Sequence, residues 1–95
     1  MTGTQRSSSD LDPRRRRALL RSWRRGMREV DLILGQFADR EIGRLSEAEL
    51  DEYEELMDVS DAELLKWITG AEPVPAERDT PLFRKLLDSR RTMEF

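Results

Sequence analysis

The residues with the clearest potential for chemistry are those of the segment Arg25-Gly26-Met27-Arg28-Glu29. The arginine offers a planar set of donors to a carboxylate or a carbonyl, and the glutamate can accept from a cation or an amide. The glycine between them costs a helix roughly 1 kcal/mol relative to alanine, but its missing Cβ lets a partner's backbone approach closely. The segment therefore suits the recognition of another protein better than catalysis.

The spacing of apolar residues predicts that this segment opens a helix that runs to about residue 39. One face of that helix is expected to meet the core and holds Gly26, Val30, Ile33, Leu34 and Phe37, with Met27 at its margin. The opposite face places an exposed leucine between ionic and amide groups and holds Arg25, Glu29, Leu32 and Gln36. The simpler interpretation of this second face is a solvated surface with an Arg25–Glu29 ion pair, worth a few tenths of a kcal/mol. The alternative is a partner-binding patch made of Arg25, Gly26, Met27, Glu29 and Leu32.

Composition excludes most catalytic and metal chemistry. The chain of 95 residues has no histidine and no cysteine, which excludes nucleophile–histidine pairs, disulfides and most zinc or iron sites. Carboxylate catalysis is possible in principle, but no spacing singles out a pair. A chain of this length forms one small domain with a modest core. We therefore expect a protein that is not an enzyme and that binds no metal and no cofactor tightly.

The charges are unevenly distributed along the chain. Residues 1–28 hold nine arginines and two aspartates, whereas residues 29–95 hold eight basic and eighteen acidic residues. Such a dipolar chain can be steered toward a partner with matching patches. The run Arg14–Arg17 leaves three interpretations open: a solvated helix face, a face that reaches an acidic partner surface, or a nucleic-acid contact. Neither interleaved surface aromatic residues nor a known binding motif supports the third interpretation.

Capping signals predict four further helices. Asp12-Pro13 starts a helix that runs to about residue 23, and Thr80-Pro81 starts another that runs to about residue 90. Leu45-Ser46-x-x-Glu49-Leu50 and Val59-Ser60-x-x-Glu63-Leu64 each combine a capping box with a hydrophobic staple. They predict helices from residue 46 to about 58 and from 61 to 69, the second ending at a left-handed Gly70. Because no strand alternation competes, the predicted fold is all-α, a compact bundle of five short helices.

The expected domain organisation is simple. Residues 1–11 should form a disordered N-terminal tail, residues 12–90 a single helical-bundle domain, and residues 91–95 a frayed C-terminal tail. No apolar run approaches the roughly 20 residues that span a membrane, and no apolar region typical of a secretory signal precedes the arginines. We expect a monomer when free, with no membrane or nucleic-acid partner. Its expected location is the cytoplasm of a bacterium, or the mitochondrial matrix if the source is eukaryotic.

Together these features resemble the succinate dehydrogenase assembly factor family, whose members are also called flavinators. Arg-Gly-x-x-Glu at the start of the second helix is present here as Arg25-Gly26-x-x-Glu29. An acidic helical hairpin and an Asp-x-x-Leu-x-x-Trp block follow, here from Asp61 to Trp67. The resemblance covers about residues 14–70 with the spacing preserved. One departure is Asp61-Ala62-Glu63, where the family often has Asp-Pro-Asp; the acidic helix start is kept.

This resemblance implies a function. Family members bind the flavoprotein subunit of succinate dehydrogenase, with fumarate reductase as a further candidate, and promote its covalent flavinylation with FAD. The implied docking residues are Arg25, Gly26 and Glu29, while the partner's own residues form the covalent bond, so that FAD belongs to the partner. The alternative left open by the residues is a regulatory protein-interaction module, antitoxin-like or nucleic-acid-associated, that uses the basic first helix.

Overall fold

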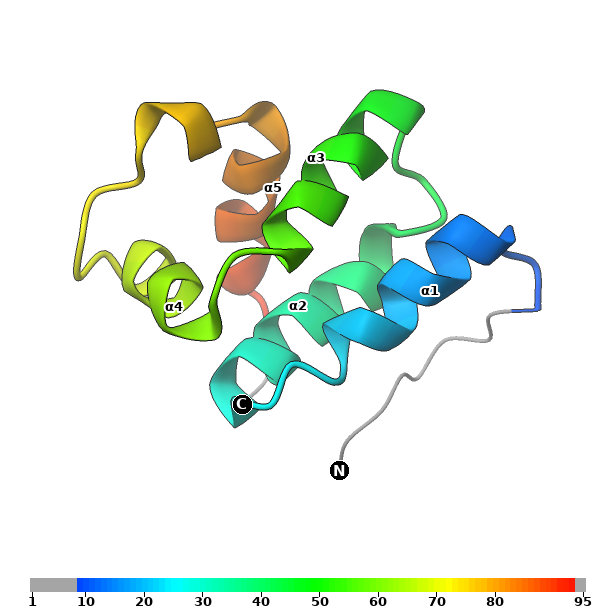
Figure 1. The fold of residues 1–95 in the computed structure, drawn as a ribbon, viewed down its shortest axis with the longest axis horizontal. Coiled ribbons are helices and arrows are strands. Elements are labelled where there is room, and N and C mark those ends of the chain that lie inside the picture. The colour runs from blue at the N-terminus through cyan, green and yellow to red at the C-terminus, as the bar shows by residue number, and fades with distance from the viewer. Residues whose placement is uncertain (1–8, 94–95) are drawn as a thin grey trace.

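The structure, a computed structural model, describes residues 9–93 as a bundle of helices (Figure 1). Its elements are α1 (Pro13–Ser22), α2 (Arg28–Glu41), α3 (Glu47–Met57), α4 (Asp61–Thr69), the short 3-10 turn η1 (Ala76–Arg78) and α5 (Pro81–Arg90). Residues 9–93 contain no strand. The predicted all-α bundle of five short helices is therefore confirmed.

The helix ends follow the capping chemistry that the sequence indicates. The Ser46 hydroxyl accepts from the Glu49 backbone N–H at 3.1 Å, and the Glu49 carboxylate accepts from the Ser46 backbone N–H at 2.9 Å. This completes the predicted capping box of α3. The side chains of the three other predicted caps also accept from the backbone N–H three residues on: Asp12, Ser60 and Thr80. The predicted second capping box is only half formed, because Ser60 accepts from the Glu63 backbone N–H but the Glu63 carboxylate does not accept from that of Ser60. α4 ends, as predicted, at Gly70 with a φ of 82°.

The predicted start of the second helix was wrong. α2 begins at Arg28, because Gly26 has a φ of 105° and Met27 has an extended backbone. A positive φ does not fit a right-handed helix, so the segment from Arg25 to Met27 belongs to the link between α1 and α2. A second difference is η1, for which the sequence carries no clear signal.

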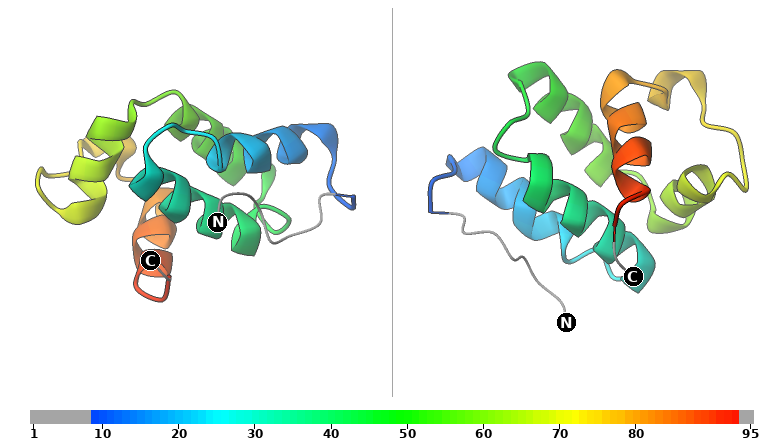
Figure 2. Two further views of the ribbon diagram at one scale, coloured as in Figure 1. Left: turned by 90° about the horizontal axis from the view of Figure 1, so that it is seen from below. Right: turned by 180° about the vertical axis from the view of Figure 1, so that it is seen from behind.

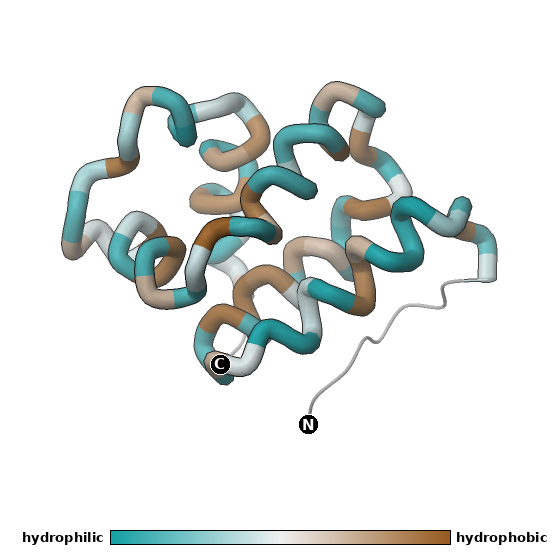
Figure 3. Tube along the Cα trace, in the orientation of Figure 1, coloured by the Kyte–Doolittle hydropathy of each residue, from teal (hydrophilic) through white to brown (hydrophobic). Residues whose placement is uncertain are grey.

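Helix α2 lies at the centre of the bundle, in contact with α1, α4 and α5, while α3 packs against α1 and α5 (Figure 2). The apolar face predicted for α2 is buried, since Val30, Leu34 and Phe37 have no exposed surface. Phe37 packs on the ring of Tyr53 from α3, with ring centroids 5.6 Å apart. Along each helix, hydrophobic residues recur at intervals, and hydrophilic residues lie between them (Figure 3). The core thus fixes the direction of α2, the helix that begins within the segment Arg25–Glu29.

A close contact inside this core involves Gly35, in the middle of α2. A Cβ placed on Gly35 would lie 2.4 Å from two ring atoms of Trp23, well inside van der Waals contact. Trp23 directly follows α1, is 7% exposed, and donates from its indole Nε1 to the Asp39 carboxylate at 3.2 Å. The indole therefore lies flat against the backbone of α2, and only glycine leaves room for it.

The first two arginines of the run in α1, Arg14 and Arg15, bind an acidic surface within their own chain. Arg14 contacts three carboxylates of α3, at 3.4 Å for Glu47 and 2.7 Å for Glu54, together with Asp51. Arg15 bonds to Asp12 and Glu47 and also donates to two backbone carbonyls after α2. The acidic face of α3 is therefore partly covered by α1. Arg14 in turn holds the pKa of Glu54 below its usual range by hydrogen bonding.

The expected tails fall partly outside the described residues, since 1–8 and 94–95 are not described. Of the rest, Leu11 is 6% exposed and Met93 is 9% exposed, and both belong to the hydrophobic core. The packed part of the chain therefore includes at least one residue on each side of the predicted domain of residues 12–90.

Candidate partner-binding site

Gly26 forms the exposed corner of the link between α1 and α2. Its φ of 105° is a conformation that residues with a Cβ rarely adopt. No heavy atom lies within 4 Å of the position that a Cβ would occupy. Space around Gly26 is therefore open, and within this chain the glycine is required by its backbone conformation. An open, side-chain-free corner also leaves room for a partner's backbone.

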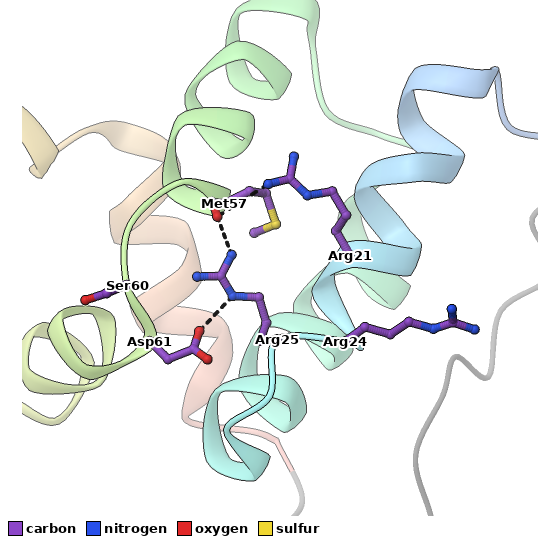
Figure 4. Close-up of a pocket in the computed structure, with 6 residues that line it drawn as sticks. All are labelled: Arg21, Arg24, Arg25, Met57, Ser60 and Asp61. Atoms are coloured by element: carbon purple, nitrogen blue, oxygen red, sulfur yellow. Dashed lines mark hydrogen bonds and ion pairs between the residues drawn. The ribbon is translucent and has the colours of Figure 1, made fainter.

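Arg25 is directed into the molecule and does not lie on the surface of α2 (Figure 4). Its side chain is 9% exposed, and its Nε donates to the Asp61 carboxylate at 2.8 Å. Its two terminal nitrogens donate to the carbonyls of Met57 and Val59, each at 2.5 Å. These carbonyls belong to the end of α3 and the turn before α4, where helix carbonyls lack partners in their own helix. The predicted Arg25–Glu29 ion pair is therefore absent from this structure, because Arg25 precedes α2 and is committed to the α3–α4 turn.

Asp31, in the first turns of α2, fixes the backbone of the same link. Its carboxylate accepts from the backbone N–H of Arg25 at 2.6 Å and from that of Gly26 at 3.3 Å. No side chain caps α2 at Met27, so Asp31 supplies the negative charge near the helix start that the dipole favours. The link is thereby held from two sides, by Asp31 through its backbone and by Asp61 through the Arg25 side chain.

The remaining predicted site residues divide into two groups. Glu29 is exposed, and within residues 9–93 its carboxylate makes no hydrogen bond or ion pair. Met27 and Leu32 are partly buried and pack against the core, so the expectation of an exposed leucine on this face was wrong. The structure thus leaves Gly26 and Glu29 open to solvent, while Arg25, Met27 and Leu32 lie behind or beside them.

A surface pocket of about 320 Å³ adjoins this link and is lined by Arg21, Arg24, Arg25, Met57, Ser60 and Asp61. Arg21 reaches the Asp58 carboxylate at 3.4 Å and Arg25 closes the pocket floor toward Asp61. Figure 4 shows Arg24 directed away from the pocket. The pocket combines donors and a carboxylate, so it suits a polar side chain of a partner better than a large flat ligand.

Two residues that shape the site carry little signal in the sequence. Asp61 lies 36 positions from Arg25, so helix spacing cannot reveal their contact. Asp31 is recognisable as an acidic residue in the first turns of a helix, but its reach back to Gly26 depends on the left-handed glycine. Neither contact could be placed without the fold.

Within residues 9–93, no group of three or more histidine, cysteine, aspartate or glutamate side chains is arranged to hold a metal ion. In the same part of the chain no helix is both long enough and apolar enough to cross a membrane. What the site does offer is an open corner, an unpaired carboxylate and a rigid support. These features belong to a small helical module with an open, polar surface at the link between α1 and α2.

Comparison with known proteins assigns the module to a family. The family model described as the flavinator of succinate dehydrogenase matches residues 16–90, and this chain belongs to that family. It is 32% identical to the FAD assembly factor SdhE of Acetobacter pasteurianus, over 90% of this chain and 78% of that protein. The family membership that the Arg25–Glu29 motif suggested is therefore confirmed.

Mitochondrial proteins are among the relatives as well. The chain is 36% identical to succinate dehydrogenase assembly factor 2 of Debaryomyces hansenii, over 87% of this chain and 61% of that protein. It is also 36% identical to the protein of the same name from Dictyostelium discoideum, over 80% of this chain and 54% of that one. The chain thus spans between half and two thirds of the length of these two mitochondrial relatives.

Proposed function

We propose that this chain is an assembly factor that binds the flavoprotein subunit of succinate dehydrogenase and promotes its covalent flavinylation with FAD. The flavoprotein subunit of fumarate reductase is a further candidate partner. Family membership supports this function. The observation that locates this function in the molecule is the open corner at Gly26 beside the unpaired Glu29. Two aspartates hold the link that contains this corner in place.

In this proposal the partner's backbone meets the chain at Gly26, and a partner cation or amide donates to Glu29. Arg25 has a different role from the one that its motif suggests, since its three donor contacts are made within the chain. It orients the corner and does not reach the partner. Met27 and Leu32 support the same surface from the core side. Binding at a preorganised surface costs less conformational entropy than binding at a mobile loop.

The chain supplies recognition, and the covalent chemistry belongs to the partner. FAD is held by the partner, and this chain binds no cofactor tightly by itself. The free chain is a monomer in this proposal and has neither a nucleic-acid nor a membrane partner. Its compartment is the cytoplasm if the source is a bacterium, like the source of the related SdhE protein, or the mitochondrial matrix if the source is a eukaryote.

Substitution at the two open positions tests this function. Glu29→Ala leaves a partner donor buried without an acceptor, which costs roughly 1–3 kcal/mol of binding, and Gly26→Arg inserts a large side chain at the contact. Both variants should lose binding to the flavoprotein subunit and lower its covalent flavin, measured by in-gel flavin fluorescence in cells that carry each variant. The matched control is Glu55→Ala, another exposed glutamate without a side-chain partner in the described structure. Wild-type flavin levels in cells with folded Glu29→Ala and Gly26→Arg proteins would refute the site.

A further inference from the structure

The arginines near the start of the chain fall into two groups by their contacts. Arg14, Arg15, Arg21 and Arg25 each form an ion pair within the chain. In contrast, the side chains of Arg17 and Arg24 are exposed and form no hydrogen bond or ion pair within residues 9–93. Arg17 lies near Glu54, but Arg14 already binds that carboxylate and is the larger cause of its lowered pKa. Arg17 and Arg24 therefore remain available at the surface on and directly after α1, and Arg28, at the start of α2, is a third exposed arginine whose side chain forms no hydrogen bond or ion pair within residues 9–93.

Leu20 lies between Arg17 and Arg24 in the sequence. Positions 17 and 20 share one face of α1, and Arg24 follows two residues after the end of α1, beyond a turn at Trp23 in which the Arg24 backbone N–H donates to the Arg21 carbonyl at 3.1 Å. Leu20 is 43% exposed and is the exposed large hydrophobic residue of the described chain. We call Arg17, Leu20 and Arg24 the basic stripe. An apolar side chain between two unpaired cations is a combination typical of protein interfaces.

The basic stripe leads directly into the proposed docking site. Arg24 immediately precedes Arg25 and Gly26, and its side chain points away from the pocket that Arg21 and Arg25 line (Figure 4). A partner surface that covers Gly26 and extends along α1 would therefore meet Arg24 first, then Leu20 and Arg17. The stripe and the open corner can belong to one continuous interface.

The surrounding charges indicate which kind of partner fits the stripe. The neighbouring helix α3 exposes Glu55, whose carboxylate makes no ion pair within residues 9–93, and the carboxylates of Asp51 and Asp58 stay 65% and 81% exposed beside Arg14 and Arg21. A polyanion such as nucleic acid, or an anionic membrane, would bring negative charge against these carboxylates as well as against the stripe. A folded protein can place carboxylates opposite the two arginines alone and an apolar residue opposite Leu20.

We propose that the basic stripe is a second docking surface, which binds an acidic patch of the flavoprotein subunit beside the Gly26–Glu29 site. The inference rests on the proposed function, because it assigns the chemistry of that same partner. Electrostatic contacts of this kind act mainly on the rate of association and on orientation. The stripe therefore brings the open corner into register with the partner, and the corner then makes the close contacts.

The experiment measures binding of the wild-type chain and of each variant to the purified apo-flavoprotein subunit of succinate dehydrogenase at low and at high salt. We expect Arg17→Glu/Arg24→Glu to weaken binding at least roughly tenfold in low salt, and the difference to shrink in salt of about 0.5 M. Leu20→Ser should weaken binding by a factor that changes little with salt. The control is Arg44→Glu/Arg91→Glu, which changes the net charge equally at two exposed arginines, 74% and 79% exposed, that only pair locally. This control should bind like the wild type.

Three outcomes would decide against the proposal. Equal binding by the stripe variant and the control would overturn the stripe alone, provided that the wild type binds and Glu29→Ala does not. Failure of the wild-type chain to bind the subunit would instead overturn the proposed function. Capture of the wild type, but not of the stripe variant, by duplex DNA or by phosphatidylserine vesicles would assign the stripe to a polyanion. Thermal melts of all variants verify that they are folded.

Discussion

Two glycines of this chain resist substitution for opposite reasons. Gly26 has room for a Cβ but has a backbone that other residues avoid, whereas Gly35 has a helical backbone but no room beside Trp23. If Gly26 were helical, its replacement by alanine would stabilise the protein. Because the observed φ is 105°, the replacement should destabilise it instead. Sequence patterns show both positions simply as glycine near or within a helix.

We predict that both alanine variants melt at lower temperature. Gly26→Ala should cost about 1–2 kcal/mol through the left-handed backbone, and Gly35→Ala about 1–3 kcal/mol through the clash with the indole. Calorimetry in a Trp23→Leu background separates the causes. There the Gly35→Ala penalty should largely vanish, while the Gly26→Ala penalty should persist. Equal penalties for Gly35→Ala in both backgrounds would contradict the packing explanation.

At the scale of elements, the α1–α2 link is tied to the α3–α4 turn by Arg25. Asp61→Asn removes the charge opposite a guanidinium that is only 9% exposed, and Arg25→Lys cannot reproduce the three donor directions. We expect each variant to lose about 1–3 kcal/mol of stability and faster amide hydrogen exchange in both connected segments. Asp79→Asn is the control, because its ion pair with Arg84 is exposed and contributes little. Faster exchange in only one of the two segments would disprove the connection.

The same scale shows how far the sequence could predict this molecule. Caps such as Ser46 with Glu49 are local hydrogen-bond patterns, so their helices were correctly placed from neighbouring residues alone. The start of α2 was not correctly placed, because the apolar periodicity fits Gly26 as one more helical position and contains no information on its φ. The contact between Arg25 and Asp61 joins segments that meet only after the chain has folded. The motif thus singled out the candidate site residues, whose role stays a prediction, but it could not show which contacts each of them makes.

At the scale of the whole molecule, the absence of histidine and cysteine determines the response to pH. No side-chain type in the chain ordinarily titrates between about pH 5.5 and 8. Below that range, carboxylates whose pKa is lowered on folding become protonated. Arg14 lowers the pKa of Glu54, and the Ser46 backbone N–H, with Lys85 second, lowers that of Glu49.

A lowered pKa in the folded state means that the unfolded chain binds protons more readily, so the stabilisation is present above the ordinary glutamate value of 4.5 and is lost as the pH falls below it. We predict a melting temperature that is nearly constant from about pH 5.5 to 8 and that falls in acid. Replacing Arg14 by methionine should make the decline in acid shallower, because Glu54 then keeps a more ordinary pKa. A melting temperature that changes steeply near neutral pH would contradict this account.

The internal position of Arg25 also has a consequence for how this protein can evolve. A surface residue that only touches a partner is free to change whenever the partner changes with it. Arg25 instead depends on Asp61 and on two carbonyls of a turn more than thirty residues away. Selection on the docking motif therefore extends to the α3–α4 turn, and lineages should tolerate a change at one of these positions only alongside a compensating change at the other.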